Sequence, residues 1–341
     1  MSSSLISWYS KAKRDLPWRK TKNPYNVWLS EIILQQTRID QGLPYYLRFV
    51  ESFPSVHDLA NASEDTVLKH WEGLGYYSRA RNLHATAKLI SMEYKGVFPN
   101  SYKALLQLKG IGPYTAAAIA SICFLEPVPV IDGNVFRFIS RFYDIEDDIS
   151  QPKTRKIFWD LLCDIISHEH PGEFNQAVME YGATVCKPSP ECGACAFTQE
   201  CFAFQHKKQR LLPVKKTKPN ITEKFFHYFI IECDGNFLMK KRQASIWKGL
   251  FEFLLIEGQK NLSKNAFPLD TKRAKLIQKD GKFKHLLTHR ILWITFYHFS
   301  VDKKYFKELM NLFDLQAYSY EEVLTLPKPK SIINYLEQVG F

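Results

Sequence analysis

The sequence of 341 residues contains no run of about 18 apolar residues free of charge, the length that a membrane-spanning helix needs. Its first residues, MSSSLISWYSKAKR, include no long apolar stretch followed by a cleavage site, so they lack the pattern of a secretory leader. Internal repeats and low-complexity tracts are also missing. These absences exclude membrane-embedded, exported and repeat proteins and predict a soluble globular chain.

Acidic residues are scarce in the last part of the chain. Residues 1–204 hold 21 Lys and Arg against 22 Asp and Glu, whereas residues 205–341 hold 25 against 13. The net charge of +11 therefore lies in the second part, where it favours a polyanionic partner such as DNA. If DNA is the partner, the near-neutral first part must hold phosphates by geometry. The charge alone leaves open an ordinary basic protein without a polyanionic partner.

Cysteine is used sparingly, and four of the seven residues lie within a short segment. Cys186, Cys192, Cys195 and Cys201 form the pattern C-x5-C-x2-C-x5-C, while the other three are scattered. This is not the disulfide framework of a small secreted protein. Four thiolates brought together need a cation to offset their repulsion, so the cluster predicts a metal or iron–sulfur centre.

The length exceeds the size at which one hydrophobic core usually stops growing, so we expect two domains. Up to about residue 180, apolar residues recur three and four positions apart, which predicts helices such as Ala104–Leu108, Ala116–Cys123 and Val135–Phe142. Residues 205–224 carry seven Lys and Arg, one acid and two prolines, which is typical of an extended basic linker.

Beyond this segment the pattern changes to runs rich in aromatic and branched residues, which predict strands. These runs are Phe225–Cys233, Phe237–Lys240, Phe251–Glu257 and Ile291–Val301. The predicted organisation is a mainly helical domain over residues 1–204, a linker over 205–224 and a mixed α+β domain over 225–341.

A glycine-containing turn at residues 108–114, LKGIGPY, predicts two helices joined by a tight hairpin. Gly110 and Gly112 permit left-handed backbone and close approach, and Pro113 suits the first position of a helix. Free N–H groups at such a helix start can hold a DNA phosphate without side-chain charge. A purely structural turn is the alternative.

Two carboxylates are candidates for catalysis. Asp132 precedes the helical pattern VFRFISRF, where an N-cap would stand. Capping donates N–H groups to the carboxylate, so a structural and a functional role are compatible. Glu31 lies in the otherwise uncharged run WLSEIILQQT, where apolar neighbours would raise its pKa and suit a proton donor. An exposed glutamate on a surface helix is the alternative.

In order and spacing, these motifs resemble those of the MutY-type adenine DNA glycosylases, within the helix–hairpin–helix superfamily. The matching stretches in the first part are LPWR at 16–19, SEIILQQTR at 30–38, WEGLGYYSRARNLH at 71–84, LKGIGPYTAAAIAS at 108–121, VIDGNVFRFISR at 130–141 and the cysteine cluster. GLFEFLLIE at 249–257 and HLLTHR at 285–290 extend the match. The resemblance implies a mainly α helix–hairpin–helix glycosylase domain with an iron–sulfur cluster loop, followed by an α+β Nudix-like domain.

The resemblance also implies catalytic roles. Glu31 would protonate N7 of a flipped-out adenine, and Asp132 would stabilise the positively charged sugar that remains. Tyr114 and Asn134 would support these carboxylates. Relatives that also cleave the strand have a lysine at position 114 to form a Schiff base, so Tyr114 predicts a monofunctional glycosylase.

Further positions match residues that contact DNA in the family. Those expected to wedge into the duplex and fill the space of the flipped base are Gln36, Thr37, Leu74 and Tyr76. Without the resemblance, the Gly73–Tyr77 segment fits a core-packing turn equally well. Arg19 matches a residue near the active site, although a surface arginine is the simpler interpretation.

The four cysteines would bind one [4Fe-4S] cluster, although their first gap is one residue shorter than the family pattern. Zinc is the alternative metal. The second domain lacks the REUxEE signature that binds magnesium in Nudix enzymes, since Glu252 and Glu257 stand without it, so we do not expect pyrophosphatase activity. Thr288 and His289 stand where the family reads the oxidised guanine.

The sequence therefore predicts a monomeric base-excision repair glycosylase that removes adenine opposite 8-oxoguanine, and less well opposite guanine, in duplex DNA. We expect it in a bacterial cytoplasm, at the nucleoid, because LPWR begins at residue 16 and leaves no room for a transit peptide. One alternative is a glycosylase for oxidised pyrimidines that also cleaves the strand. Another is a non-catalytic DNA-binding or iron–sulfur sensing protein.

Overall fold

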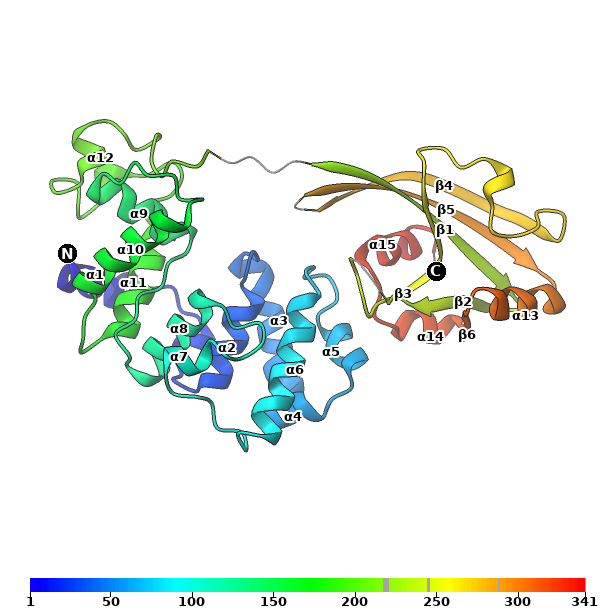
Figure 1. The fold of residues 1–341 in the computed structure, drawn as a ribbon, viewed down its shortest axis with the longest axis horizontal. Helices are drawn as coiled ribbons and strands as arrows, with labels where there is room; N and C mark the ends of the chain where they lie inside the picture. Colours follow the sequence, from blue (N-terminus) through cyan, green and yellow to red (C-terminus); the bar gives the residue numbers. More distant parts are fainter. Residues whose placement is uncertain (217–220, 244–245, 288, 341) are drawn as a thin grey trace. The chain divides into compact units, whose positions relative to one another are not determined.

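The computed structural model describes residues 1–216, 221–243, 246–287 and 289–340. The chain forms two compact units (Figure 1). The first unit is Met1–Asn61 with Asn82–Thr217, and the second is Ala62–Arg81 with Lys218–Phe341. Among the described residues, no helix is both long enough and apolar enough to cross a membrane.

The first unit is built from helices and contains no strand within its described residues. The elements from the N-terminus to residue 205, in chain order, are α1 (Ser2–Ala12), η1 (Pro17–Arg19), α2 (Pro24–Ile33), α3 (Ile39–Ser52), α4 (Val56–Asn61), α5 (Glu64–His70), α6 (Ser78–Met92), α7 (Tyr102–Leu105), α8 (Pro113–Phe124), α9 (Gly133–Tyr143), α10 (Pro152–Ile165), α11 (Pro171–Thr184), η2 (Cys192–Ala194) and α12 (Phe202–Gln205). Helix α5 and the start of α6 belong to the second unit.

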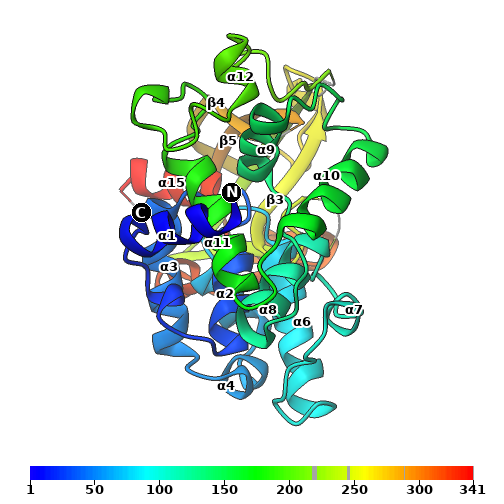
Figure 2. The same ribbon diagram turned by 90° about the vertical axis from the view of Figure 1, so that its left-hand side faces the viewer.

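Helix α11 lies at the centre of the first unit, where it packs against α1, α8 and α9 (Figure 2). The apolar spacing of α9 explains its place, because Val135, Phe138, Ile139 and Phe142 recur three and four positions apart and all are buried. The helices predicted at Val135–Phe142 and Ala116–Cys123 are confirmed as parts of α9 and α8. The helix predicted from Ala104 ends earlier than expected, at Leu105.

The second unit contains a six-stranded sheet in the order β4-β5-β1-β3-β2-β6, in which β1 and β5 pair parallel and the other neighbours antiparallel. Its elements after residue 221 are β1 (Thr222–Cys233), β2 (Asn236–Lys241), β3 (Phe251–Gly258), η3 (Lys264–Ala266), β4 (Ala274–Leu287), β5 (Arg290–Val301), α13 (Lys303–Leu312), β6 (Gln316–Ser319), α14 (Tyr320–Thr325) and α15 (Lys330–Gln338). Helix α13 packs into one apolar cluster of this sheet and α14 and α15 into another. The four predicted strands are confirmed as β1, β2, β3 and β5.

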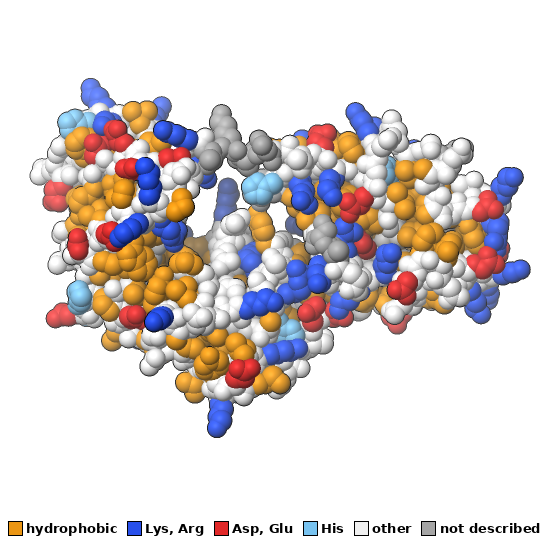
Figure 3. All heavy atoms as spheres, viewed as in Figure 1, with side chains coloured by type: hydrophobic (Ala, Val, Ile, Leu, Met, Phe, Trp, Pro, Cys, Tyr) orange, Lys and Arg blue, Asp and Glu red, His pale blue; other side chains and the backbone are white. Residues whose placement is uncertain are grey.

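Strand β4 was not predicted, and its sequence explains why. It is an edge strand with mostly exposed residues, so it carries no regular alternation of apolar and polar positions. Two register shifts, between Leu276 and Gln278 and between Gly281 and Phe283, interrupt the pattern further. Figure 3 shows Lys and Arg side chains on the surface of this unit, as its charge requires.

Two segments belong to a different unit from the one that their position in the sequence suggests. Residues 62–81 join the second unit, where Lys69 Nζ donates to the Leu324 carbonyl at 3.0 Å and Glu72 accepts the backbone N–H of Lys328 at 3.0 Å. Part of the segment expected to be a linker lies against the first unit, because the Leu212 carbonyl accepts from Arg141 Nε at 3.0 Å.

Candidate active site

A cavity of about 680 Å³ in the first unit brings together the four residues predicted to act in catalysis. Three helix ends supply them. Glu31 lies in the last turn of α2, Tyr114 in the first turn of α8, and Asp132 and Asn134 at the start of α9. Residues more than 100 positions apart in the sequence thus face one space of ligand-binding size.

Glu31 is placed in this cavity by an apolar helix. Its neighbours Ile32 and Ile33 are buried, and the pKa of the Glu31 carboxyl is raised to about 7. Burial is the main cause and the negative charge of Asp132 adds to it, while a hydrogen bond from Tyr114 and the charge of Arg19 act in the opposite direction. A carboxyl with this pKa is available as a general acid near neutral pH.

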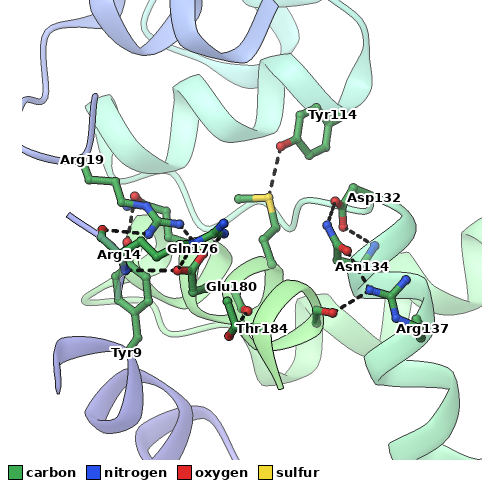
Figure 4. A network of polar contacts seen from close by, with 12 residues as sticks. Tyr9, Arg14, Arg19, Tyr114, Asp132, Asn134, Arg137, Gln176, Glu180 and Thr184 are labelled. Carbon is green, nitrogen blue, oxygen red and sulfur yellow. Dashed lines mark hydrogen bonds and ion pairs between the residues drawn. The ribbon is translucent and has the colours of Figure 1, made fainter. Parts of the chain in front are cut away.

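Tyr114 contributes a neutral hydroxyl. Its oxygen lies 3.1 Å from Met179 Sδ (Figure 4). Burial, together with the nearby charges of Glu31 and Asp132, raises the pKa of the Tyr114 hydroxyl well above its usual value. The group therefore stays protonated at neutral pH, and it offers no amine that could attack the sugar.

Asp132 is both the N-cap of α9 and a wall of the cavity. Its carboxylate accepts the backbone N–H groups of Asn134 at 2.9 Å and Val135 at 2.8 Å, and the side-chain amide of Asn134 at 2.8 Å. Burial raises the pKa of Asp132, and these three donors oppose that effect by stabilising the charged form. The capping role and a role in the site coexist, as the sequence allows.

Arg137 extends this arrangement along α9. Its guanidinium donates to Asn134 Oδ1 at 2.8 Å and to the Gly182 carbonyl at 2.6 Å (Figure 4). It also donates to the Cys186 carbonyl at 2.8 Å. Arg137 thus binds both Asn134, whose side chain donates to Asp132, and the backbone of Cys186, the first of the four clustered cysteines.

Glu180 of α11 is a residue of the cavity that sequence reasoning missed. Its carboxylate, 1% exposed, accepts hydrogen bonds from Arg14 Nε at 2.7 Å, Arg14 Nη2 at 2.6 Å and Arg19 Nη2 at 2.7 Å (Figure 4). Although burial alone would raise it, the hydrogen bonds from the two arginines lower the pKa of Glu180 to about 2. Arg19, expected near the active site, is therefore in the cavity wall as half of a buried ion pair.

The residues expected to contact DNA lie in turns. Gln36, with a left-handed φ of 56°, is exposed between α2 and α3, and Thr37 lines the cavity. Tyr76 is 47% exposed with φ of 48°, whereas Leu74 is only 6% exposed. Of the two predicted wedge residues in residues 73–77, Tyr76 is the one that reaches the surface.

The hairpin before α8 has the backbone that its glycines predicted. Gly110 has φ of 82°, and a Cβ there would lie 2.7 Å from Cβ of Asn82. Gly112 is the N-cap of α8, where no side chain caps the helix and Pro113 follows. The start of α8 therefore offers the uncapped N–H groups that an anion could accept from.

The four cysteines of the cluster line one cavity, together with Phe138 and Phe197. Within the described residues, no three His, Cys, Asp or Glu side chains are close enough to hold a single metal ion. Three of the sulfurs have polar contacts. Cys195 Sγ lies 3.0 Å from the Tyr181 hydroxyl, Arg141 donates to Cys186 Sγ at 3.4 Å, and Cys201 Sγ lies 3.5 Å from the Arg141 carbonyl. The arginine donor stabilises a thiolate, so the four cysteines fit the ligand set of a cluster that binds each sulfur through a different iron.

The second unit has a cavity of its own, of about 670 Å³. His289 lines it, as do Tyr76 and Leu74, while Thr288 lies outside the described residues. Glu252 is buried in an ion pair with Arg242 at 2.9 Å, and Glu257 pairs with the same arginine at 2.7 Å. Both carboxylates are therefore engaged in protein contacts.

Comparison with known proteins decides the family. A family described as HhH-GPD superfamily base excision DNA repair protein matches residues 29–163, and the NUDIX domain family matches residues 227–338. The adenine DNA glycosylase of Buchnera aphidicola subsp. Acyrthosiphon pisum is 39% identical over 255 residues, covering 74% of this chain and 73% of that protein. That of Buchnera aphidicola subsp. Baizongia pistaciae is 37% identical, covering 85% and 83%. The chain belongs to the adenine DNA glycosylase family.

This chain is also similar to a human adenine DNA glycosylase and to solved structures of other DNA-repair proteins. The human adenine DNA glycosylase is 42% identical over 219 residues, covering 61% of this chain and 40% of that protein. A thermostable thymine-DNA glycosylase has a TM-score of 0.55 at 26% identity, covering 60% of this chain and 95% of that one. A non-covalent endonuclease III–DNA complex, at 20% identity and TM-score 0.52, covers 61% and 95% and shows the fold alone. The predicted helix–hairpin–helix domain and Nudix-like α+β domain of this glycosylase are confirmed.

Proposed function

We propose that this glycosylase hydrolyses the N-glycosidic bond of adenine mispaired with 8-oxoguanine, and less well with guanine, in duplex DNA. The observation that carries the proposal is the pairing of Glu31, whose pKa is about 7, with the triply hydrogen-bonded Asp132 in one cavity. Two carboxyl groups with opposite tasks, one acid and one anion, are what cleavage of a glycosidic bond requires.

The reaction is a hydrolysis in which the base leaves first and water then adds to the sugar. Glu31 gives its proton to N7 of adenine, and the C1′–N9 bond breaks with its electron pair leaving on the base. The sugar then resembles an oxocarbenium ion, which the negative charge of Asp132 stabilises. Water adds to C1′ and gives a proton to the Glu31 carboxylate, so the products are neutral adenine and an abasic site, and Glu31 is protonated again. Because Tyr114 has no amine, the strand stays intact.

Glu180 and Arg19 support the proposal through the shape of the cavity wall. Four N–H groups of Arg14 and Arg19 bind the Glu180 carboxylate, two on each oxygen, so this ion pair has no free acceptor for a base. Its role is to hold the cavity wall in place and to keep its own charge away from the acid, Glu31.

The cysteine loop supports one [4Fe-4S] cluster bound by Cys186, Cys192, Cys195 and Cys201, the ligand set that such a cluster takes. The cluster would hold residues 186–201 in a fixed shape against α9 and α11. Arg137 binds the Cys186 carbonyl and Asn134, and Asn134 binds Asp132, so a fixed loop would also restrict the position of Asp132.

The division of labour follows the charge. We propose that residues 1–204 carry the chemistry, that 225–341 recognise the oxidised guanine, and that 205–224 join them. The backbone at Gly110 and Gly112 would hold a phosphate. The space that the flipped base leaves in the duplex would be filled by Gln36, Thr37, Leu74 and Tyr76. Thr288 and His289 would read the oxidised edge. We also propose that the enzyme acts as a monomer at the nucleoid, as several relatives are bacterial.

The test is incubation with a duplex that carries one adenine opposite 8-oxoguanine, followed by gel analysis with and without alkali. Strand breaks that appear only after alkali are expected, because a monofunctional glycosylase leaves an abasic site. Breaks without alkali would support a glycosylase with lyase activity. No breaks under either condition would support a non-catalytic DNA-binding protein.

A further inference from the structure

Trp247 stands in the wall of the second unit's cavity and has no role in the function proposed above. It is half-buried in the turn between β2 and β3, with a left-handed φ of 63°. Bulky residues rarely adopt this backbone conformation, and such outliers gather at binding sites.

Buried polar contacts hold this turn in place. Arg242 Nε donates to the Ile246 carbonyl at 2.8 Å, and the same guanidinium is ion-paired with the buried Glu252. The backbone N–H of Leu250 donates to the Trp247 carbonyl at 3.0 Å. These contacts hold the backbone at residues 246 and 247, the kind of support that a recognition residue requires.

Two rings fix the orientation of the indole. Its centroid lies 5.5 Å from that of His285 and 6.0 Å from that of Phe226, both in edge-to-face geometry. Burial, together with the charge of Lys330, lowers the pKa of His285, so this ring is uncharged at neutral pH. Trp247 and His285 thus form a neutral aromatic wall on one side of the cavity.

Three cationic side chains also line this cavity, those of Arg81, Arg290 and Lys330. An aromatic wall with cations around a space of about 670 Å³ suits a nucleotide, whose base is flat and whose phosphates are anionic. We propose that Trp247, supported by His285, makes a direct contact with the base that lies opposite the adenine. This inference rests on the proposed function and assigns it a recognition residue outside the HLLTHR segment.

The test uses the full-length protein and two duplexes that differ only opposite the adenine. Both carry 2′-fluoro-2′-deoxyadenosine, because the fluorine destabilises the charged sugar and prevents cleavage. One has 8-oxoguanine in the opposite position, and the other has a tetrahydrofuran residue, which has no base. Trp247→Leu should weaken binding to the first by about tenfold and to the second by less than about twofold, since only the first offers a ring to contact.

Matched variants separate recognition from folding. Trp247→Phe, which keeps a ring, should retain most of the preference for the base-containing duplex. His285→Leu removes the supporting ring without altering the turn and should reduce the preference by a smaller factor. Trp293→Leu replaces a half-buried tryptophan of β5 that contacts Lys284 outside the cavity, and should leave the preference unchanged. Thermal melting of each variant is recorded alongside.

Equal weakening on both duplexes, or no change on either, would overturn the inference, provided that the wild-type protein releases adenine opposite 8-oxoguanine from a cleavable duplex. A wild-type protein without that activity would contradict the proposed function itself. The two failures are therefore distinguishable.

Discussion

Three of the carboxylates that line the cavity of the first unit, Glu31, Asp132 and Glu180, lie in different surroundings, which give them different pKa values. Apolar neighbours raise the pKa of Glu31 to about 7, whereas two arginines lower that of Glu180 to about 2. Asp132 is held by three hydrogen-bond donors. Environments that push carboxyl pKa values apart are how an enzyme assigns one group as the acid and keeps another as an anion.

The pH dependence of base release follows from the raised pKa of Glu31. Only the protonated carboxyl can donate, so the single-turnover rate should be high below about pH 7 and fall as the pH rises through that value. Tyr114→Phe removes a hydrogen bond that lowers the pKa of Glu31, and should move the falling limb to higher pH. Rates measured across the neutral range with saturating enzyme check both.

Tyr102→Phe serves as the control, because Tyr102 of α7 is not part of this cavity. In the Tyr114→Phe variant, a fall in rate that stays at the wild-type pH, or that moves to lower pH, would contradict the assignment of Glu31 as an acid whose pKa is lowered by Tyr114.

Single residues differ in how far the sequence reveals them. Asp132 could be predicted because its capping partners, Asn134 and Val135, lie two and three residues away. Glu180 could not, because its partners Arg14 and Arg19 are 166 and 161 positions distant. A lone acid in a helix shows no sign of such partners, and only the packing of α11 against the N-terminal segment brings them together.

At the scale of elements, the hairpin before α8 depends on one of its two glycines for stability. Gly110→Ala should lower the free energy of unfolding by about 1–2 kcal/mol, because alanine resists a φ of 82° and its Cβ would meet Asn82. The midpoint of thermal unfolding should fall by several degrees.

Gly112→Ala is the matched control for the hairpin. No atom lies within 4 Å of a Cβ at this position, and its φ of −87° suits any residue. Its melting temperature should therefore stay near that of the wild type. Equal losses in the two variants would show that the left-handed conformation of Gly110 is not what stabilises the hairpin.

The cysteine loop makes a prediction that is independent of activity. The purified protein should be brown and hold about four irons per chain, the content of one [4Fe-4S] cluster. Cys192→Ser should lose the colour and most of the iron, whereas Cys163→Ser, in α10 and outside the cluster cavity, should keep both. Metal analysis that finds stoichiometric zinc in a colourless, active protein would contradict the cluster.

Elements are predictable where their apolar pattern is regular. The runs that became β1, β3 and β5 are nearly continuous because both faces of the sheet are covered. Strand β4 escaped prediction because it is an exposed, bulged edge. That strand carries His285, which begins the HLLTHR match, but Trp247 lies in a turn outside every matching stretch, so the contact between these two rings had no signal in the sequence.

At the scale of the whole molecule, recognition of the oxidised base should be separable from excision. Under the proposed function, Thr288 and His289 would offer a hydroxyl and an imidazole to the altered edge of 8-oxoguanine. Replacing both with alanine should reduce the preference for adenine opposite 8-oxoguanine over adenine opposite guanine by roughly ten- to hundredfold, since a bidentate base contact contributes about 1–3 kcal/mol of discrimination.

The measurement for this prediction is the ratio of single-turnover rates on the two mispairs, with enzyme in excess over DNA but below saturation. Excision opposite plain guanine should change little, because the catalytic cavity is untouched. If activity on both mispairs falls by the same factor, the pair serves packing or a phosphate contact and the reader of the lesion lies elsewhere.

The most direct test of the central claim compares wild type and Glu31→Gln on adenine opposite 8-oxoguanine. Glutamine keeps the shape of the side chain and removes its proton, so the account predicts a loss of at least about 10²–10⁴-fold in the single-turnover rate, with binding to an uncleavable duplex nearly intact. A Glu31→Gln variant that releases adenine within about threefold of the wild-type rate, far less than general acid catalysis contributes, would contradict the account.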